Sequence, residues 1–293
     1  MPIADVPPDV RLAYDTFGDP GDPPVLLVMG FGAQLLAWEE GFCQALADRG
    51  RYVIRYDNRD CGLSTRFDDR PVDLLRFVAA VSSGDVDRAL AMVPYSLADM
   101  AEDGMGLLTA LGIERAHVVG ASMGGMIAQL MAIAHPERVL TLTSMMSSTG
   151  EQEYGQATRE AQAVLFRGRP ADREGHVAAA ERDLVWASRR YGDAAVLRDL
   201  AGRSYDRAYY PAGIGRQLGA MVLAGSRADA LRKLTVPTLV IHGLDDTLIA
   251  PSGGERTAEL VPGAKLLLVP DMGHDRPREL WPVLVEALAA HTA

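Results

Sequence analysis

Short apolar runs recur along the chain, and stretches with helical spacing of apolar residues separate them. Continuous apolar runs of this kind are typical of strands buried in a parallel sheet. They predict strands at residues 25–29, 52–56, 117–120, 139–145, 238–242 and 265–269, and an alternating stretch predicts an edge strand at 11–17. The helical stretches predict helices at residues 38–48, 97–111, 126–134 and 277–290. The two patterns together indicate an α/β domain.

Two segments break this alternation. Residues 65–94 show helical spacing where the simple alternation of strand and helix needs no insertion. Residues 147–231 are rich in Arg, Ala, Glu and Asp and contain no strong strand. We predict a catalytic core formed by residues 1–146 and 232–293, with residues 147–231 inserted as a helical lid over the carboxyl ends of the strands. Whether residues 65–94 join the lid, and which lid residues line a pocket, is left open.

A turn of small residues follows the strand at 117–120 and opens the next helix. Gly120-Ala121-Ser122-Met123-Gly124 fits the GxSxG pattern, in which a serine sits on a strained turn between strand and helix. The glycines let strand and helix approach closely, so that the serine hydroxyl projects from the sheet. An ordinary Gly and Ser turn is the alternative, but the strand before and the helix after favour Ser122 as a nucleophile.

A second turn, Gly30-Phe31-Gly32, directly follows the strand at 25–29. A serine that attacks a carbonyl needs two N–H donors where the oxyanion forms. One donor is the residue after the serine, and the other comes from a loop at the end of an early strand. We expect the backbone amides of Met123 and Phe31 to supply them, although this turn taken alone also fits a plain connection.

Candidates for an acid and a base lie downstream of the serine. A serine hydroxyl is a poor nucleophile at neutral pH, so it needs a histidine base that an acid holds in one tautomer. Asp245 and Asp246 share the turn after the strand at 238–242, and His274 lies in the loop after the last strand. The chain order Ser, Asp, His would bring these loops to one sheet edge. His117, His135 and His242 fit packing at strand or helix ends, and His291 fits a frayed tail.

Composition narrows the classes of function. With 29 basic and 39 acidic side chains the net charge is −10, which disfavours nucleic acid as a partner. No apolar stretch approaches a membrane span, and the first residues carry no secretory signal. The 2 cysteines and 6 histidines show no metal-ligand spacing. We expect a cytoplasmic enzyme that acts on a small molecule without metal or cofactor, with a homodimer as one option.

Five segments resemble the α/β-hydrolase superfamily, and the resemblance covers nearly the whole chain. They are Val28-Met29-Gly30-Phe31, Asp57-Asn58-Arg59-Asp60-Cys61-Gly62-Leu63-Ser64, Gly120-Ala121-Ser122-Met123-Gly124-Gly125, Gly243-Leu244-Asp245-Asp246 and Met272-Gly273-His274. The resemblance implies a mostly parallel central sheet with helices on both faces and an inserted helical lid. It also implies Ser122 as nucleophile, His274 as base and Asp246 as acid, because the family places the acid three residues after the glycine.

Within the superfamily, the chain most resembles the aclacinomycin methylesterase-like group of actinobacteria, which hydrolyses methyl esters of polyketide antibiotics. Met29 stands where many superfamily members carry histidine, and the methylesterase-like group shares this departure. The resemblance implies a serine carboxylesterase that works through an acyl-enzyme on small or medium-sized esters. A cofactor-free haloperoxidase or perhydrolase with the same triad, and a ligand-binding member without turnover, remain alternatives. Dehalogenases and epoxide hydrolases are disfavoured because they carry aspartate at the elbow.

Overall fold

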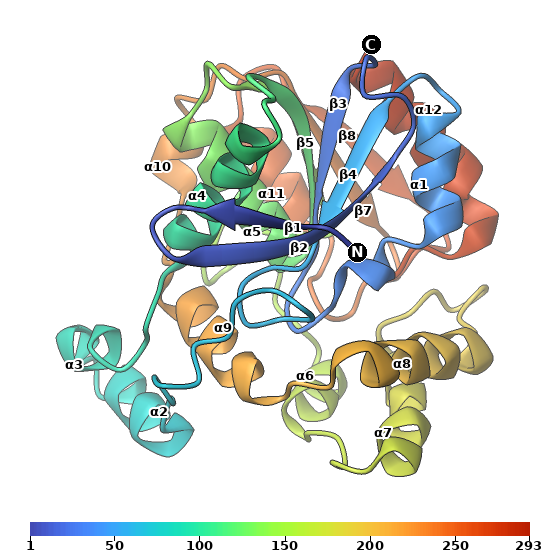
Figure 1. Cartoon of the computed structure of the whole chain (residues 1–293). Helices are drawn as coiled ribbons and strands as arrows, with labels where there is room; N and C mark the ends of the chain where they lie inside the picture. Colours follow the sequence, from blue (N-terminus) through green and yellow to red (C-terminus); the bar gives the residue numbers. More distant parts are fainter.

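The computed structural model describes all 293 residues, and its centre is one eight-stranded sheet (Figure 1). In chain order the strands are β1 (Ile3–Val6), β2 (Val10–Phe17), β3 (Pro24–Val28), β4 (Tyr52–Tyr56), β5 (Ala116–Ala121), β6 (Val139–Met145), β7 (Thr238–Gly243) and β8 (Lys265–Val269). Their order across the sheet is β1-β2-β4-β3-β5-β6-β7-β8. β2 pairs antiparallel with β1 and β4, and every pair from β4 to β8 is parallel. The prediction of a mostly parallel sheet is confirmed.

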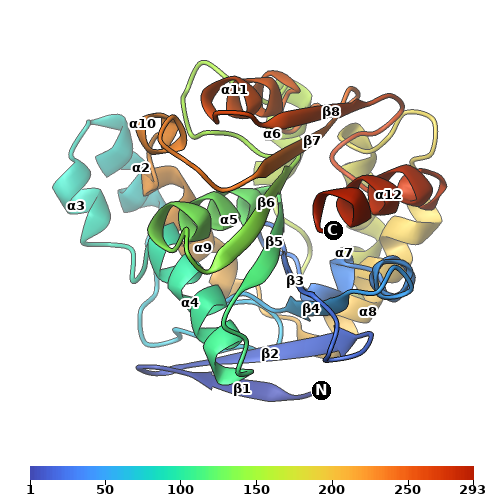
Figure 2. The ribbon, with the colours of Figure 1, turned by 90° about the horizontal axis from the view of Figure 1, so that it is seen from above.

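Helices cover both faces of this sheet, as predicted (Figure 2). The α-helices are α1 (Glu40–Ala47), α2 (Leu74–Ser82), α3 (Val86–Leu90), α4 (Leu97–Ala110), α5 (Met123–Ala134), α6 (Arg159–Phe166), α7 (Arg173–Ala179), α8 (Ala194–Ala208), α9 (Ala212–Leu223), α10 (Ala228–Leu231), α11 (Ser252–Leu260) and α12 (Trp281–His291). Short 3₁₀ helices are η1 (Leu35–Ala37), η2 (Ala180–Val185) and η3 (Arg278–Leu280). Successive strand residues point to opposite faces, so Leu26 packs with α4 and α5 while Leu27 packs with α1 and α12.

Predicted and observed strands agree closely, except at the amino-terminal edge of the sheet. The strands predicted at 52–56, 139–145 and 265–269 have the same bounds in β4, β6 and β8. β1 was not predicted, because only Ala4 and Val6 of its four residues are buried and two prolines follow it. It pairs with one neighbour only, β2, at the edge of the sheet.

Helices α6 to α10 lie between β6 and β7 in the chain. In Figure 1, α6 to α9 lie beyond the carboxyl ends of the parallel strands, which is where the sequence places a lid. α10 differs from the others, because it packs against α5 and α11 and buries Leu231 in the main core. Residues 147–231 are called the inserted region below, and their bounds as a separate lid domain stay a prediction.

The second predicted break, residues 65–94, forms α2 and α3 (Figure 1). Asp73 and Asp85 cap the two helices by accepting hydrogen bonds from backbone amides. Phe77, Ala80 and Ala89 form a small cluster of their own, which contacts Leu223 of α9. This segment, called the α2–α3 excursion below, packs on the outer side of the inserted region and contributes no residue to the cavity described next.

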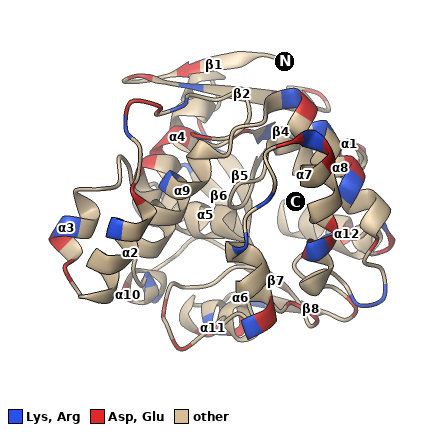
Figure 3. Ribbon diagram, turned by 90° about the horizontal axis from the view of Figure 1, so that it is seen from below, with Lys and Arg blue, Asp and Glu red and all other residues tan.

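Basic and acidic residues are interspersed over the elements of the fold (Figure 3). The net charge of −10 is therefore spread rather than gathered in one block. None of the helices combines the length and the apolar character that crossing a bilayer demands.

Candidate active site

Ser122 sits on a sharp turn between β5 and α5. Its backbone has φ 58° and ψ −125°, a conformation that L residues rarely adopt. The Ser122 amide donates to the carbonyl of Met145 (2.9 Å), and the Ser147 hydroxyl donates to the Ser122 carbonyl (2.8 Å). These contacts to the β6 strand and the loop after it hold the turn in its strained form.

The glycines on either side of Ser122 are required by close backbone contacts. A Cβ atom on Gly120 would lie 2.0 Å from the Gly124 carbonyl oxygen, and one on Gly124 would lie 2.1 Å from the Val28 carbonyl oxygen. Because real Cβ atoms never approach so closely, any larger residue would push α5 away from the sheet. The close packing that the sequence pattern predicts at this turn is present.

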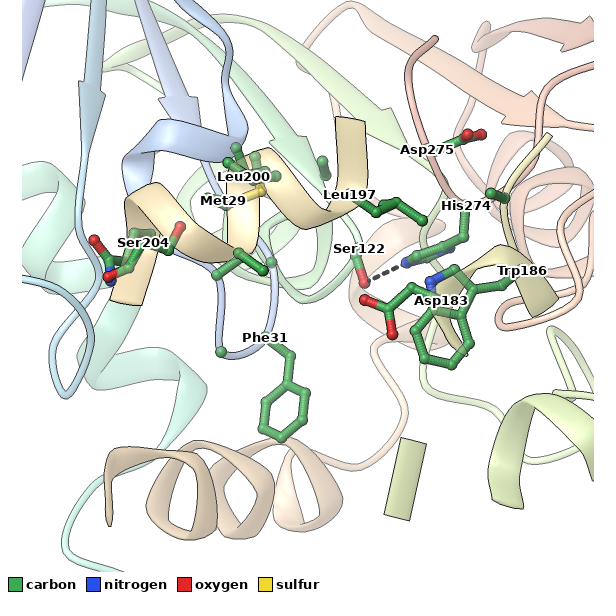
Figure 4. Close-up of a pocket in the computed structure, with 18 of the residues that line it drawn as sticks. Met29, Phe31, Ser122, Asp183, Trp186, Leu197, Leu200, Ser204, His274 and Asp275 are labelled. Carbon is green, nitrogen blue, oxygen red and sulfur yellow. Dashed lines mark hydrogen bonds between the residues drawn. The ribbon is translucent and has the colours of Figure 1, made fainter. Parts of the chain in front are cut away.

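Three side chains from distant parts of the chain form one hydrogen-bonded line, and Figure 4 shows its contact between Ser122 and His274. Nε2 of His274 lies 2.9 Å from the Ser122 hydroxyl oxygen, and Nδ1 of His274 lies 2.7 Å from Oδ2 of Asp246. An ionised carboxylate only accepts hydrogen bonds, so Nδ1 carries the ring proton and Nε2 is free to accept from the serine. Such a line removes the serine proton as the oxygen attacks.

Asp246 is buried and held as an anion. Its Oδ1 accepts from the amides of Leu248 (2.9 Å) and Ile249 (2.8 Å). Burial alone would raise its pKa, but the charge of His274 and the hydrogen bonds from His274 and His242 lower the pKa of Asp246 to about 2. The group is therefore ionised at neutral pH, as an orienting acid must be.

His242 takes part in this arrangement in a way that the sequence did not indicate. It is fully buried, its Nε2 donates to the Ile249 carbonyl (2.8 Å), and the same nitrogen lies 3.4 Å from Oδ2 of Asp246. Sequence reasoning assigned His242 to strand-end packing, and no local pattern marks its contact with the acid. His242, on β7, is thus a second imidazole beside the carboxylate of Asp246.

The rival acid, Asp245, points elsewhere. Its carboxylate accepts from the Arg189 amide (3.3 Å) and lies 3.8 Å from the Arg189 guanidinium. It makes no hydrogen bond with His274. Of the two adjacent aspartates, the geometry therefore favours Asp246 as the partner of the histidine.

The two expected oxyanion donors lie on either side of the serine. Met123 is the first residue of α5, so its amide has no partner inside the helix, and the Phe31 amide donates to no backbone carbonyl. A Cβ atom on Gly30 would lie 3.0 Å from Cβ of Ser122, which shows how closely the Gly30 loop passes the serine. The Phe31 ring points away from Ser122 (Figure 4), so only its backbone faces the site.

Comparison with known proteins places this arrangement in a family. The sequence profile of the alpha/beta hydrolase fold family matches residues 23–275. The chain belongs to that family. Relatives with an assigned activity include the rhodomycin D methylesterases DauP of Streptomyces sp. strain C5 and DnrP of Streptomyces peucetius. They are 30% and 29% identical to this chain, and each alignment covers 97% of this chain and 95% of the relative.

A solved structure agrees with this α/β hydrolase over its whole length. A hydrolase from Pseudomonas aeruginosa PA01 superposes with a TM-score of 0.73 at 26% identity, covering 99% of this chain and 97% of the other. The fold class predicted from the sequence and the resemblance to methylesterases are thereby confirmed.

In this α/β hydrolase the inserted region bonds directly to the catalytic loops. The His274 amide donates to the Trp186 carbonyl (2.6 Å), and the Ser188 amide donates to Oδ1 of Asp275 (2.9 Å). On the oxyanion side, the Gly32 amide donates to the Gln217 side chain of α9 (2.9 Å). The inserted region therefore fixes the loops of both the base and the oxyanion donors.

A cavity of about 770 Å³ opens above Ser122 and His274. Its walls are mainly apolar and come from both the core and the inserted region. Figure 4 shows Leu197 and Trp186 on one side of the serine and Met29 and Leu200 on the other. Tyr205 and Tyr209, stacked at 4.4 Å between ring centroids, also line it, together with His176. This volume suits a drug-sized organic molecule.

The structure offers no obvious place for a metal. No group of three or more His, Cys, Asp or Glu side chains lies close enough to share an ion. Cys43 and Cys61 are buried as free thiols, and burial raises the pKa of both. They fit packing roles.

Proposed function

We propose that this protein is a carboxylic ester hydrolase that acts through Ser122, His274 and Asp246. The observation that carries the proposal is the line of hydrogen bonds from the Ser122 hydroxyl through His274 to Asp246, at the floor of an apolar cavity. Relatives named as rhodomycin D methylesterases support an ester as substrate. They also favour a methyl ester of a polyketide, which the volume and aromatic lining of the cavity suit.

The first half of the reaction forms an acyl-enzyme. His274 takes the hydroxyl proton as the Ser122 oxygen attacks the ester carbonyl, and the imidazolium that forms is stabilised by Asp246. The amides of Phe31 and Met123 stabilise the negative charge on the carbonyl oxygen. His274 then gives its proton to the leaving alcohol as the ester C–O bond breaks.

The second half regenerates the enzyme. His274 takes a proton from water, which attacks the acyl carbonyl, and the same two amides stabilise the second oxyanion. Collapse of this intermediate releases the carboxylic acid and returns the proton from His274 to Ser122. These steps need no cofactor.

The proposal is tested with a series of p-nitrophenyl and methyl esters, following p-nitrophenol or methanol release. We expect the wild type to hydrolyse them and Ser122→Ala to lose at least about 10³-fold in kcat, as removal of a nucleophilic serine does elsewhere. Ser204→Ala is the matched control, because Ser204 also lines the cavity but makes no contact with His274. Its kcat should stay within about threefold of wild type.

Two other outcomes would redirect the assignment. Bromination of a reporter dye in the presence of peroxide and bromide, without ester turnover, would favour a haloperoxidase or perhydrolase. Binding of an aromatic ester without release of alcohol would favour a ligand-binding protein.

A further inference from the structure

Arg276 lines the cavity, and ester hydrolysis as described above gives it no role. It lies two residues after His274 in the loop that follows β8. Consecutive Cα atoms are about 3.8 Å apart, so the Cα atoms of these two residues are at most about 7.6 Å apart. The long Arg276 side chain therefore starts close to where a substrate would meet the base.

The guanidinium of Arg276 has few partners within the protein. One terminal nitrogen donates to the Ala37 carbonyl (2.7 Å), and the group stacks over the Trp38 ring at 4.2 Å from its centroid. No carboxylate lies within the 4.0 Å limit of an ion pair, and the other two nitrogens donate to no protein acceptor. Because arginine carries five N–H donors, most of its capacity for hydrogen bonding is unused.

The nearest acidic side chains already have partners. Oδ1 of Asp275 accepts from the amides of Ser188 (2.9 Å) and Gly273 (3.2 Å). Glu39 pairs with Arg278 at 2.7 Å. Neither carboxylate is positioned to neutralise Arg276 by direct contact.

The charge on Arg276 is therefore only partly exposed to water and has no counter-ion in direct contact. Burial lowers the pKa of Arg276 to about 10, and the more distant charges of Asp275 and Glu39 offset only part of this effect. The group is still cationic at neutral pH. Arg276 is half-buried, so part of its hydration is lost without a carboxylate in contact, and a bound anion would supply that partner.

We propose that Arg276 binds an anionic group of the substrate, so that preferred substrates are esters that also carry a free carboxylate. Half-esters of dicarboxylic acids represent this class. The proposal rests on the proposed function, because it places the carboxylate relative to an ester held at Ser122. Arginine suits this role because its planar group binds a carboxylate through two parallel hydrogen bonds.

The test compares monomethyl and dimethyl esters of succinate, glutarate and adipate, which differ by a single charge. We expect wild type to prefer the monoester for at least one chain length. Arg276→Leu should lose about 10- to 100-fold in kcat/KM on that monoester and less than about threefold on the diester. Arg276→Lys keeps the charge and should retain part of the preference.

Control variants separate Arg276 from its cationic neighbours. Arg278→Gln removes a cation that already pairs with Glu39 and should keep the preference for the monoester. Arg182 also lines the cavity without an ion pair, so Arg182→Gln is measured in parallel. The proposal would be overturned if Arg182→Gln alone lost the preference for the monoester. It would also be overturned if wild type and Arg276→Leu preferred the monoester equally.

A binding measurement distinguishes failure of this inference from failure of the proposed function. Titration calorimetry should show that glutarate binds to the Ser122→Ala protein. The double variant that carries both Ser122→Ala and Arg276→Leu should not bind glutarate. Glutarate binding without any ester turnover would reject the esterase proposal and keep the anion site. Turnover of neutral esters with no glutarate binding and no monoester preference would reject the anion site alone.

Discussion

The inserted region and the α2–α3 excursion both interrupt the alternation of strand and helix, but they are attached to the core in different ways. Arg207 and Arg216 of the inserted region reach into the core and pair with Asp57 and Asp60, both fully buried, at 2.8 and 2.7 Å. The α2–α3 excursion has no buried carboxylate, and its most exposed apolar side chain, Leu75, is 86% exposed. Only the first of the two segments contacts the catalytic loops.

This difference shows what an insertion needs in order to shape an active site. Burial of apolar surface is non-directional, whereas buried ion pairs and backbone hydrogen bonds fix distance and direction. In the inserted region, the Trp186 carbonyl and the Gln217 side chain bond directly to the loops that carry the base and the oxyanion donors. We therefore treat it as part of the catalytic scaffold, and the following variants test that view.

The largest expected effect is on the buried ion pair between Arg216 and Asp60. Arg216→Met would leave the Asp60 carboxylate with the Tyr95 hydroxyl as its remaining side-chain donor. Removing one partner of a buried pair costs about 3–5 kcal/mol of unfolding free energy. Urea unfolding measures this loss. In the excursion, Arg76→Gln breaks an exposed pair with Asp73 and should cost less than about 0.5 kcal/mol. Equal losses would contradict the comparison.

The next effect concerns Gly273, beside the base. A Cβ atom here would lie 2.4 Å from the Trp186 carbonyl oxygen, so Gly273→Ala must separate the inserted region from the His274 loop. A displacement of about 1 Å at a catalytic group costs about 100-fold, and we expect such a loss in kcat. Gly84→Ala is the control, because a Cβ there meets nothing within 4 Å. It should lower stability by about 1 kcal/mol through its positive φ without changing kcat.

A pH series gives a smaller effect, at the core residue that orients the base. The folded pKa of Asp246, about 2, lies below the value of about 3.9 for an unfolded aspartate. The ionised group therefore stabilises the fold fully above about pH 4, and this contribution is lost as the pH falls toward about 2. Asp246→Asn should lower the unfolding free energy by about 2 kcal/mol at pH 7. This difference between the variant and wild type should shrink as the pH falls. A difference in unfolding free energy that does not change with pH would show that ionised Asp246 does not stabilise the fold in this way.

The smallest effect is expected at Leu75 in the α2–α3 excursion. Leu75→Ser exposes no new apolar surface and breaks no contact with the catalytic loops, because the side chain is already in solvent. Its unfolding free energy and kcat/KM should stay within about 0.5 kcal/mol and twofold of wild type. A large drop in activity would mean that the excursion contributes to the site after all.

Much of this structure could be predicted from the sequence because its signals are local. The strands β4, β6 and β8 are rich in apolar and β-branched residues, and the turn around Ser122 needs glycines at fixed positions. The order of Ser122, Asp246 and His274 follows from where the loops of a parallel sheet meet.

What the sequence did not indicate depends on contacts between distant residues. Arg216 and Asp60 are 156 positions apart, and nothing near either one marks the pair. The support of Asp246 by His242 and the approach of Trp186 to His274 likewise appear only when the loops are folded together. Asp246 was preferred over Asp245 only through the resemblance to the family, and the structure adds the direction of each side chain, which two adjacent residues in a turn do not reveal.

The most direct test of the central claim is the intact mass of the protein after reaction with an activated fluorophosphonate, followed by peptide mapping. We predict one adduct on Ser122 in wild type, none in Ser122→Ala, and much slower labelling in His274→Gln, because the hydroxyl would then lack its base. Ester turnover without any adduct on Ser122, or labelling of Ser122→Ala at the wild-type rate, would contradict the account.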